Sequence, residues 1–317
     1  MKKIAVAPGV ELSEISLGAG SRGAEKDEAL VFSIMDRYVE AGGTTIDSAR
    51  LYADGRADAA LGKWLGSRSN RDRIVIVSKG SYPVVDATHV SRLSPAEIGR
   101  DIDESLAAMG VPYSDLHLLH RDDVRIPVGE IMRPLDALVR AGKTRAVGVS
   151  NWTVSRIAEA NGFAAENGLA PITCCQMHYS LAQTTAAATG DITHVPMSDV
   201  EYAWYKETGL PVMAFGVQAH GWFAKRAAGG DPKGFFARYY DYFPENHRRL
   251  ERLVRLSRET GKTLSALTTA YARDSGLNVS PLCAFSSIAQ LEECLDALTF
   301  TLTPDQVRYL ESGGELK

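Results

Sequence analysis

Short apolar runs alternate with amphipathic segments along nearly the whole of this 317-residue chain. Runs rich in β-branched residues predict strands, and a period of about 3.6 residues between them predicts helices. The predicted strands cover residues 15–18, 44–47, 74–79, 115–119, 144–149, 172–176, 211–215 and 278–283. The predicted helices cover residues 27–41, 55–66, 95–109, 128–141, 153–166, 199–208, 246–260, 263–273 and 288–298. Eight strand-then-helix units in one α/β chain favour a closed (β/α)8 TIM barrel, and we expect residues 1–317 to form one domain.

Three features depart from this simple repeat. Residues 4–12 turn at Pro8-Gly9 and predict an N-terminal β-hairpin that covers the barrel floor. The stretches 177–198 and 216–245 predict long loops after the sixth and seventh strands, on the face where barrel loops shape substrate pockets. Two helices precede the last strand, which is one more than the repeat requires.

Composition and charge exclude several classes of partner. Charged residues make up 23% of the chain and the formal net charge is −4, which gives no basic surface for nucleic acid or an anionic membrane. No apolar run reaches the roughly 18 residues of a membrane helix, and the N-terminus lacks the apolar core of a signal peptide. Cys174, Cys175, Cys283 and Cys294 do not have metal-ligand spacing. We expect a cytoplasmic, metal-free protein that acts on a small molecule, as a monomer or a homo-oligomer.

A glycine-rich segment follows the first predicted strand. Residues 18–23 read GAGSRG and match the G-x-G-x-x-G pattern of a dinucleotide-binding Rossmann fold. A Rossmann helix begins within these glycines, whereas a polar helix start follows them here, and the preceding strand is too polar to be buried on both faces. We therefore interpret this segment as a glycine-rich loop at a barrel rim.

Three polar residues lie just past the ends of short apolar runs: Asp47, Lys79 and His120. Tyr52 follows about one turn after the first of them. Because parallel strand ends converge on one face, these side chains are expected to surround one pocket. Singly, they also suit a helix cap, an exposed lysine, a structural histidine and a packed tyrosine. The strand pattern alone does not choose between His120 and the nearby His117.

Together these residues suit carbonyl reduction by hydride transfer, which leaves a negative charge on oxygen. A tyrosine phenol can supply the proton, but its ordinary pKa near 10 is high for work at neutral pH. An ammonium at Lys79 would lower the pKa of Tyr52, and Asp47 would keep Lys79 charged and oriented. His120 could hydrogen-bond the substrate oxygen.

Four segments resemble motifs of the aldo-keto reductases in order and spacing. Residues 47–52 (DSARLY) with 61–62 (LG) resemble D-T-A-x-x-Y…L-G, and residues 77–79 (VSK) resemble the family's lysine strand. Residues 115–123 (DLHLLHRDD) resemble D-L-x-x-x-H-x-x-D, and residues 142–151 (GKTRAVGVSN) resemble G-K-I-R-x-I-G-V-S-N. The resemblance places the catalytic histidine at position 120. It implies an NAD(P)H-dependent reductase on a (β/α)8 barrel with Tyr52 as general acid.

The same resemblance implies a set of cofactor contacts. Ser150, Asn151 and Gln176 match the residues that bind the nicotinamide carboxamide. Phe215 stands where the family usually stacks a tyrosine on the nicotinamide ring, and Gly216 begins the loop that folds against the pyrophosphate.

The sequence departs from the family pattern at the far end of this cofactor site. Residues 215–221 (FGVQAHG) lack the serine and proline of the usual Y-S-P-L-x-x-G loop. Ser286 replaces a cation that often meets the 2′-phosphate of NADP(H), Gln290 is retained, and Cys294 replaces an asparagine that would contact adenine. NADP(H) is expected first, with NAD(H) as the alternative.

Substrate-pocket residues are predicted at the barrel rim. They are Arg121, Trp152 and Tyr179, with Asp122 and His178 beside them. The aromatic segment 235–243 is a candidate roof. Aromatic and polar groups of this kind suit a sugar-type carbonyl, and they equally suit the packing of a lid.

Two other classes of function fit parts of the pattern. One is a nucleotide-binding regulatory or interaction subunit with little turnover, which the altered phosphate and adenine motifs favour. The other is a lyase that uses Lys79 as a Schiff base, which the neighbouring Asp47 and Tyr52 disfavour.

Overall fold

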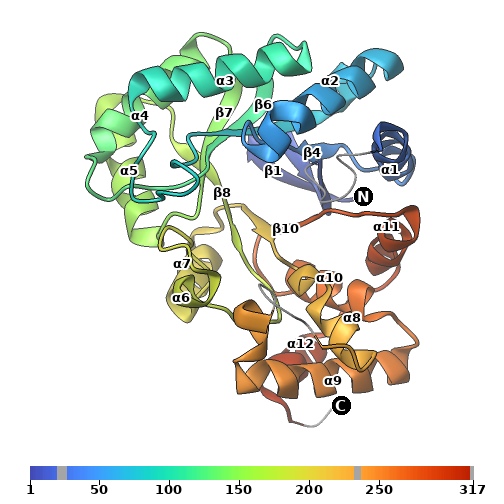
Figure 1. Cartoon of the computed structure of the whole chain (residues 1–317). Coiled ribbons are helices and arrows are strands. Elements are labelled where there is room, and N and C mark those ends of the chain that lie inside the picture. Colours follow the sequence, from blue (N-terminus) through green and yellow to red (C-terminus); the bar gives the residue numbers. More distant parts are fainter. Residues whose placement is uncertain (20–26, 232–236, 315–317) are drawn as a thin grey trace.

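A closed barrel of eight parallel strands forms the centre of the molecule (Figure 1). The computed structural model describes residues 1–19, 27–231 and 237–314. The strands are β3 (Ser16–Gly18), β4 (Thr45–Asp47), β5 (Val75–Gly80), β6 (Ser114–Leu119), β7 (Thr144–Ser150), β8 (Ile172–His178), β9 (Val212–Phe215) and β10 (Val279–Cys283). They pair in chain order, and β10 closes the ring against β3. The expected (β/α)8 TIM barrel is confirmed.

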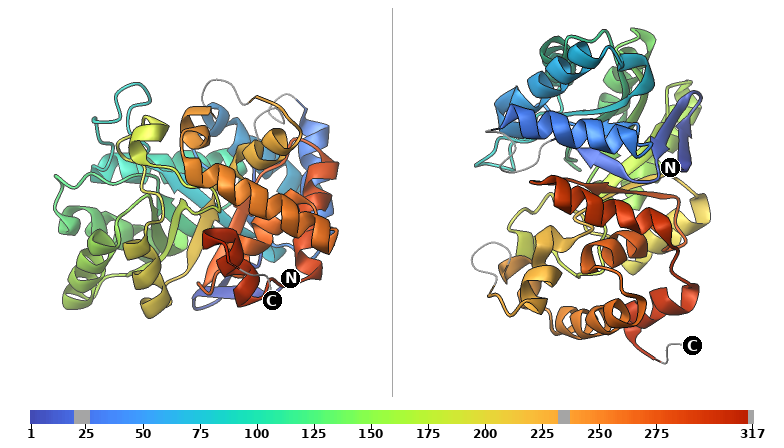
Figure 2. Two further views of the ribbon diagram at one scale, coloured as in Figure 1. Left: turned by 90° about the horizontal axis from the view of Figure 1, so that it is seen from below. Right: turned by 90° about the vertical axis from the view of Figure 1, so that its right-hand side faces the viewer.

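Helices surround the barrel. The longer ones are α1 (Glu28–Glu40), α2 (Arg56–Arg68), α3 (Pro95–Met109), α4 (Val128–Arg140), α5 (Val154–Asn167), α7 (Asp199–Thr208), α9 (Pro244–Thr260), α10 (Leu264–Arg273), α11 (Ile288–Leu295) and α12 (Pro304–Ser312). Helices α1 and α11, from opposite ends of the chain, lie side by side (Figure 2), and Arg37 pairs with Glu292 between them at 2.5 Å. No helix within the described part of the chain is long and apolar enough to cross a membrane.

The two stretches expected as long loops contain short helices as well. The first holds α6 (Ala186–Thr189), and the second holds α8 (Trp222–Ala227) and a π-helical turn (Ala237–Asp241). Neither short helix was expected, and neither was α12. An element of four to six residues gives too little periodic pattern to be found in a sequence.

Side chains alternate between the inside and the outside of the barrel. The interior cluster contains Leu12, Val77, Leu116, Leu118, Ala146, Cys174 and Met213. Leu12 comes from the N-terminal hairpin of β1 (Lys3–Ala7) and β2 (Val10–Ser13), which packs against the starts of the strands and hydrogen-bonds Thr45 through the backbone N–H of Ser13. The interior is therefore filled with side chains, and the next inward positions along the strands lie at the opposite, open end.

Gly62 on α2 allows this helix to approach the end of α3. A Cβ at position 62 would lie 2.4 Å from the carbonyl oxygen of Met109, which belongs to the backbone of α3. Gly66 lies in the same helix, and a Cβ there would meet nothing within 4 Å. The two glycines thus differ in surroundings but share one helix.

We expect Gly62→Ala to lower the free energy of unfolding by about 1–3 kcal/mol, because the new methyl group overlaps backbone that cannot easily move. Gly66→Ala is the matched control and should raise stability by roughly 0.5–1 kcal/mol, the ordinary gain of alanine over glycine in a helix. Urea unfolding followed by circular dichroism measures both. A stabilising Gly62→Ala would show that α2 and α3 can separate at no cost.

Candidate active site

A buried ion pair joins the ends of β4 and β5. The Nζ atom of Lys79 lies 2.5 Å from both carboxylate oxygens of Asp47, and the two side chains are at most 1% exposed. The side-chain amide of Gln176 donates a further hydrogen bond of 2.8 Å to Asp47 Oδ1. Burial alone would lower the pKa of Lys79, but its charge and hydrogen-bond interactions with Asp47 and Tyr52 together outweigh burial, and the pKa is raised. Lys79 is therefore an ammonium at neutral pH.

Tyr52 reaches this ion pair from the turn that follows β4. The turn is fixed by backbone hydrogen bonds from Ser48 to Val77 and from Arg50 to Lys79. Lys79 Nζ lies 4.9 Å from the centroid of the Tyr52 ring.

The pKa of Tyr52 differs from the sequence-based expectation. Burial raises it, and the opposing attraction of the Lys79 ammonium is too small to bring it below its ordinary value. Desolvation of a phenolate thus outweighs one nearby cation. The phenol is fully protonated at neutral pH, which is the form that can give a proton away.

A carboxylate that the sequence analysis missed holds the turn between Asp47 and Tyr52. The hydroxyl of Ser48 donates to Asp58 Oδ1 at 2.5 Å, and Ser105 donates to Asp58 Oδ2 at 2.7 Å. Asp58 is completely buried, and burial raises its pKa. The two hydroxyl groups tie the turn to α2 and α3, which fixes the position of Tyr52.

His120 faces Tyr52, whereas His117 does not. The Tyr52 and His120 ring centroids are 5.9 Å apart, edge to face. Burial lowers the pKa of His120 well below its ordinary value, and the charges of Arg121 and Lys79 add to this, so the imidazole is neutral. His117 points outward from the barrel, where its Nδ1 lies 2.8 Å from the hydroxyl of Ser78.

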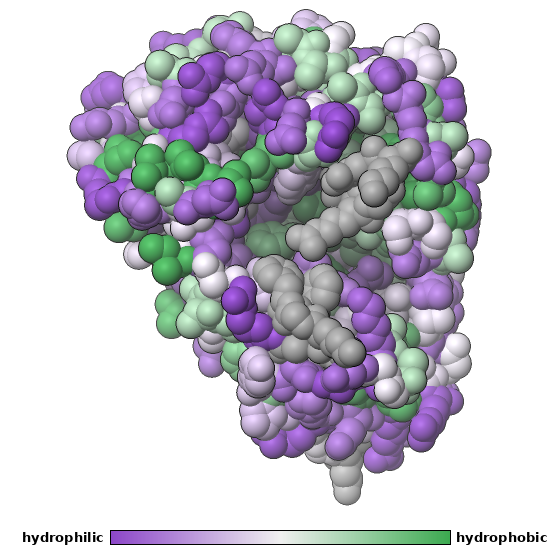
Figure 3. Space-filling view, viewed as in Figure 1, coloured by the Kyte–Doolittle hydropathy of each residue, from purple (hydrophilic) through white to green (hydrophobic). Residues whose placement is uncertain are grey.

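Two adjoining cavities meet at Tyr52. The larger, of about 320 Å³, is lined by Leu51, Tyr52, Tyr82, His120, Arg121, Ser150, Asn151, Gln176, His178, Asp191, His194, Phe215, His220, Tyr239 and Leu282. The smaller, of about 240 Å³, is lined by Gly18, Asp47, Tyr52, Phe215, Gly216, Val217, Gln218, His220, Leu282, Cys283 and Ala284. In the space-filling view the molecule is hollowed between its upper and lower parts, with apolar side chains at the bottom of the hollow (Figure 3).

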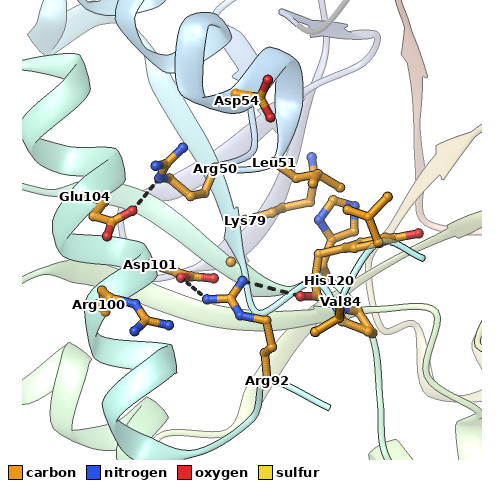
Figure 4. A pocket seen from close by; sticks show the side chains of 14 residues that line it. Arg50, Leu51, Asp54, Lys79, Val84, Arg92, Arg100, Asp101, Glu104 and His120 are labelled. Carbon is orange, nitrogen blue, oxygen red and sulfur yellow. Dashed lines mark hydrogen bonds and ion pairs between the residues drawn. The ribbon is translucent and has the colours of Figure 1, made fainter. Parts of the chain in front are cut away.

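A third cavity of about 330 Å³ lies beside Lys79 and His120 (Figure 4). Arginine side chains enter it from α3 and the loops before α2 and α3. Most of this charge is compensated, because Arg50 pairs with Glu104 at 2.6 Å and Arg92 pairs with Asp101 at 2.5 Å. These ion pairs hold together one side of this cavity, and we assign them a structural role.

Five of the predicted cofactor-binding residues line the two cavities at Tyr52, and the other two, Ser286 and Gln290, lie outside them. Ser150, Asn151, Gln176 and Phe215 line the larger cavity, and Gly216 lines the smaller one. Asn151 adopts a left-handed φ of 58°, and its amide donates to the Ser150 hydroxyl at 2.9 Å.

Ser286 and Gln290 lie beyond β10, exposed and hydrogen-bonded to each other at 3.0 Å, outside the lining that the described residues give to the two cavities. Cys294 is completely buried against Thr269, so it faces the protein interior. The far end of the predicted cofactor site is therefore an exposed surface at the start of α11.

Two of the predicted substrate residues lie outside the lining that the described residues give to these cavities. Trp152 is completely buried beneath Arg156, 5.4 Å from the guanidinium, because the chain turns into α5 directly after it. Tyr179 lines a separate pocket with Tyr271 and Glu311. Within the described residues, neither contributes to the cavities at Tyr52, whereas Arg121 does.

The remaining predicted rim residues have different surroundings. Asp122 pairs with Arg156 at 3.2 Å, while His178 lines the larger cavity and hydrogen-bonds Tyr240. Tyr239 supplies part of the expected aromatic roof, and residues 235 and 236 lie outside the described residues.

Several residues of the larger cavity were not indicated by the sequence: Tyr82, Asp191, His194 and His220. The first three come from loops and His220 from the one-turn 3-10 helix Ala219–Gly221, where no periodic pattern indicates which side chain points inward. No group of three or more metal-ligating side chains within residues 1–19, 27–231 and 237–314 could hold a metal ion.

A family model and several known proteins are similar to this chain over nearly its whole length. The model of the aldo/keto reductase family matches residues 14–315. The norsolorinic acid reductase of Aspergillus flavus is 28% identical over 309 residues, which cover 95% of this chain and 76% of the relative. An aryl-alcohol dehydrogenase (NADP(+)) of Phanerodontia chrysosporium is 24% identical over 335 residues, covering 98% and 84%. The uncharacterized oxidoreductase YrpG of Bacillus subtilis is 24% identical over 321 residues, covering 97% and 95%.

We expect Lys79→Met to lower the free energy of unfolding at pH 7 by roughly 3–5 kcal/mol, because it leaves the Asp47 carboxylate buried without its cation. The double variant Asp47→Asn with Lys79→Met removes both charges and should lose much less. Urea unfolding followed by circular dichroism measures both. Lys63→Met, which breaks the exposed pair with Glu28, is the control and should change little. If the double variant were as unstable as Lys79→Met, lost packing rather than unpaired charge would be the cause.

Proposed function

Because this chain belongs to the aldo/keto reductase family, we propose that it reduces an aldehyde or ketone to the alcohol with a nicotinamide cofactor and with Tyr52 as the proton donor. The observation that carries the proposal is the position of the Tyr52 phenol. It lies beside the Lys79–Asp47 ion pair, faces His120, and stands where two cavities meet.

The chemistry of the cavity walls fits a nicotinamide. Ser150, Asn151 and Gln176 place a hydroxyl and two amides together, which are partners that a carboxamide can use as both donor and acceptor. The flat ring of Phe215 separates the two cavities and suits stacking against the nicotinamide, where a hydroxyl is not needed. A bound, reduced cofactor would supply a hydride to the carbonyl carbon.

The chain's own residues control the proton. Tyr52 holds its proton at neutral pH and gives it to the carbonyl oxygen as negative charge develops, since an alkoxide is a stronger base than a phenolate. The Lys79 ammonium stabilises the phenolate that is left, and Asp47 keeps Lys79 charged. The neutral imidazole of His120 orients the substrate oxygen without competing for the proton.

An aryl carbonyl is the substrate that this cavity suits best. Tyr82, His194, His220 and Tyr239 add aromatic rings to its wall, and such rings pack in edge-to-face or stacked arrangements on a planar substrate. The name of one relative, the aryl-alcohol dehydrogenase of Phanerodontia chrysosporium, supports the same substrate class. An aromatic substrate therefore ranks ahead of the sugar-type carbonyl.

We expect Tyr52→Phe to lower kcat for benzaldehyde reduction by about 10²–10⁴-fold, because the proton donor is removed. The dissociation constant for NADPH, measured by fluorescence quenching, should stay nearly unchanged. Tyr82→Phe is the matched control, since Tyr82 also faces His120, with ring centroids 4.9 Å apart, and should keep most of the activity. A Tyr52→Phe enzyme with full activity would refute the assigned proton donor.

The same measurements separate the enzyme from a nucleotide-binding subunit. An unaltered protein that binds NADPH tightly but reduces none of a broad panel of aryl aldehydes would be such a subunit. Turnover that disappears with Tyr52→Phe would exclude it.

We expect Ser286→Arg to tighten NADPH binding by roughly tenfold or more and to leave NADH binding unchanged, because a guanidinium makes charge-assisted hydrogen bonds to a phosphate. Ser286 is exposed and stands where the family often has a cation for the 2′-phosphate. Ala107→Arg on the exposed face of α3 adds the same charge at a distance and serves as the control. Equal tightening by both variants would indicate a general charge effect and contradict this position for the 2′-phosphate.

A further inference from the structure

The loop that follows α6 brings an unusual histidine into the larger cavity. His194 is only 5% exposed, and its Nδ1 has no hydrogen-bond partner within residues 1–19, 27–231 and 237–314. A buried polar atom without a partner is unfavourable in a folded protein. Because Nδ1 is shielded from solvent, a ligand would meet the imidazole from the side that lines the cavity.

His194 is neutral, which limits the groups that it can recognise. Burial lowers its pKa to about 4, and the positive charge of Arg121 contributes to this shift. A neutral imidazole nitrogen is either an acceptor or a donor, depending on the tautomer. A hydroxyl group can pair with it in both cases, because a hydroxyl both donates and accepts.

Arg121 gives the same wall a fixed hydrogen-bond donor. Its Nε and Nη2 donate to Asp191 Oδ2 at 3.3 and 3.1 Å, and its Nη1 donates to the His120 carbonyl at 2.8 Å. A guanidinium carries five N–H groups, and these three bonds hold it in the wall beside Tyr82, whose ring centroid lies 5.0 Å away. His194 is joined to this pair, because its backbone N–H donates to the Asp191 carbonyl at 3.0 Å.

The charge balance of this wall favours a neutral substituent over an anion. Asp191 compensates the charge of Arg121, so a carboxylate on the substrate would meet a carboxylate as well as a guanidinium. A ring hydroxyl can accept a hydrogen bond from Arg121 and pair with His194 without that repulsion.

Ring contacts indicate that the substituent is attached to a flat group. The His194 ring lies 5.7 Å from Phe215 and 5.4 Å from His178, in tilted and edge-to-face arrangements. Tyr239 lies 6.5 Å from His194 on the same wall. An aromatic ring fits against these surfaces better than the saturated ring of a sugar.

We propose that the substrate is an aryl carbonyl that carries a ring hydroxyl, and that His194 and Arg121 recognise this hydroxyl. The proposal rests on the proposed reductase function and specifies its substrate. His194 is then a specificity-determining residue, because a site built to hydrogen-bond a hydroxyl rejects analogues that lack it.

The test compares benzaldehydes that differ in one substituent. The series contains benzaldehyde and the 2-, 3- and 4-isomers of hydroxy-, methoxy- and carboxybenzaldehyde, each reduced with NADPH. At least one hydroxy isomer should have a kcat/KM about tenfold or more above its methoxy and carboxy counterparts. A carboxy isomer that is preferred over its hydroxy counterpart would overturn the proposal.

His194→Phe keeps the ring but removes its nitrogens. It should lower kcat/KM for the preferred hydroxy isomer about tenfold more than it lowers kcat/KM for benzaldehyde. His89→Phe, at an exposed position, is the control and should retain the preference. A hydroxy-to-methoxy ratio that His194→Phe does not change would refute the proposal, since a purely structural histidine would lower both substrates together.

Ligand binding separates this proposal from the reductase function. If no aldehyde in the series is reduced, the reductase proposal fails, and calorimetric binding of the same compounds in the presence of NADP+ decides the recognition of the hydroxyl. A binding preference for a hydroxy isomer that His194→Phe abolishes would support it. Equal binding of hydroxy and methoxy isomers would refute it.

Discussion

The buried ion pair between Asp47 and Lys79 is the constraint on which the candidate site depends. Separating the two charges inside the barrel would be very costly, so the ends of β4 and β5 are held together. The turn after Asp47 carries Tyr52, and the hydroxyls of Ser48 and Ser105 bind Asp58 and fix that turn against α2 and α3. An apolar pair would be easier to bury, but it would leave no cation beside the phenol. The charge thus links the stability of the barrel mouth to the chemistry proposed for it.

Most of the barrel follows from the sequence because strand periodicity is a local property. The same periodicity also separates His120 from His117 once the inward face is known. Leu116 and Leu118 fill the barrel interior, so His117 points outward and position 120 returns to the inward side just past the end of β6. The sequence alone does not show which face is inward, and the family resemblance supplied that choice.

The properties that the sequence could not give depend on three-dimensional surroundings. The pKa of Tyr52 is set by the balance of burial and a nearby ammonium, and burial is invisible in a sequence. Asp191 and His194 enter the cavity from a loop, which has no repeating pattern. Trp152 and Arg121 each stand two positions after the end of a strand. The turn into α5 nevertheless buries Trp152 completely. Loop geometry therefore positions much of the cavity wall, whereas strand ends position Asp47, Lys79 and His120.

The N-terminal hairpin affects how a ligand can enter the barrel. Leu12 closes one end of the barrel, and the interior cluster fills the space above it. Within the described residues, the barrel is therefore filled at the hairpin end, and a ligand that contacts Gln176 approaches from the end where the strands finish. The hairpin at the floor thus sets the direction from which a ligand comes to the buried ion pair.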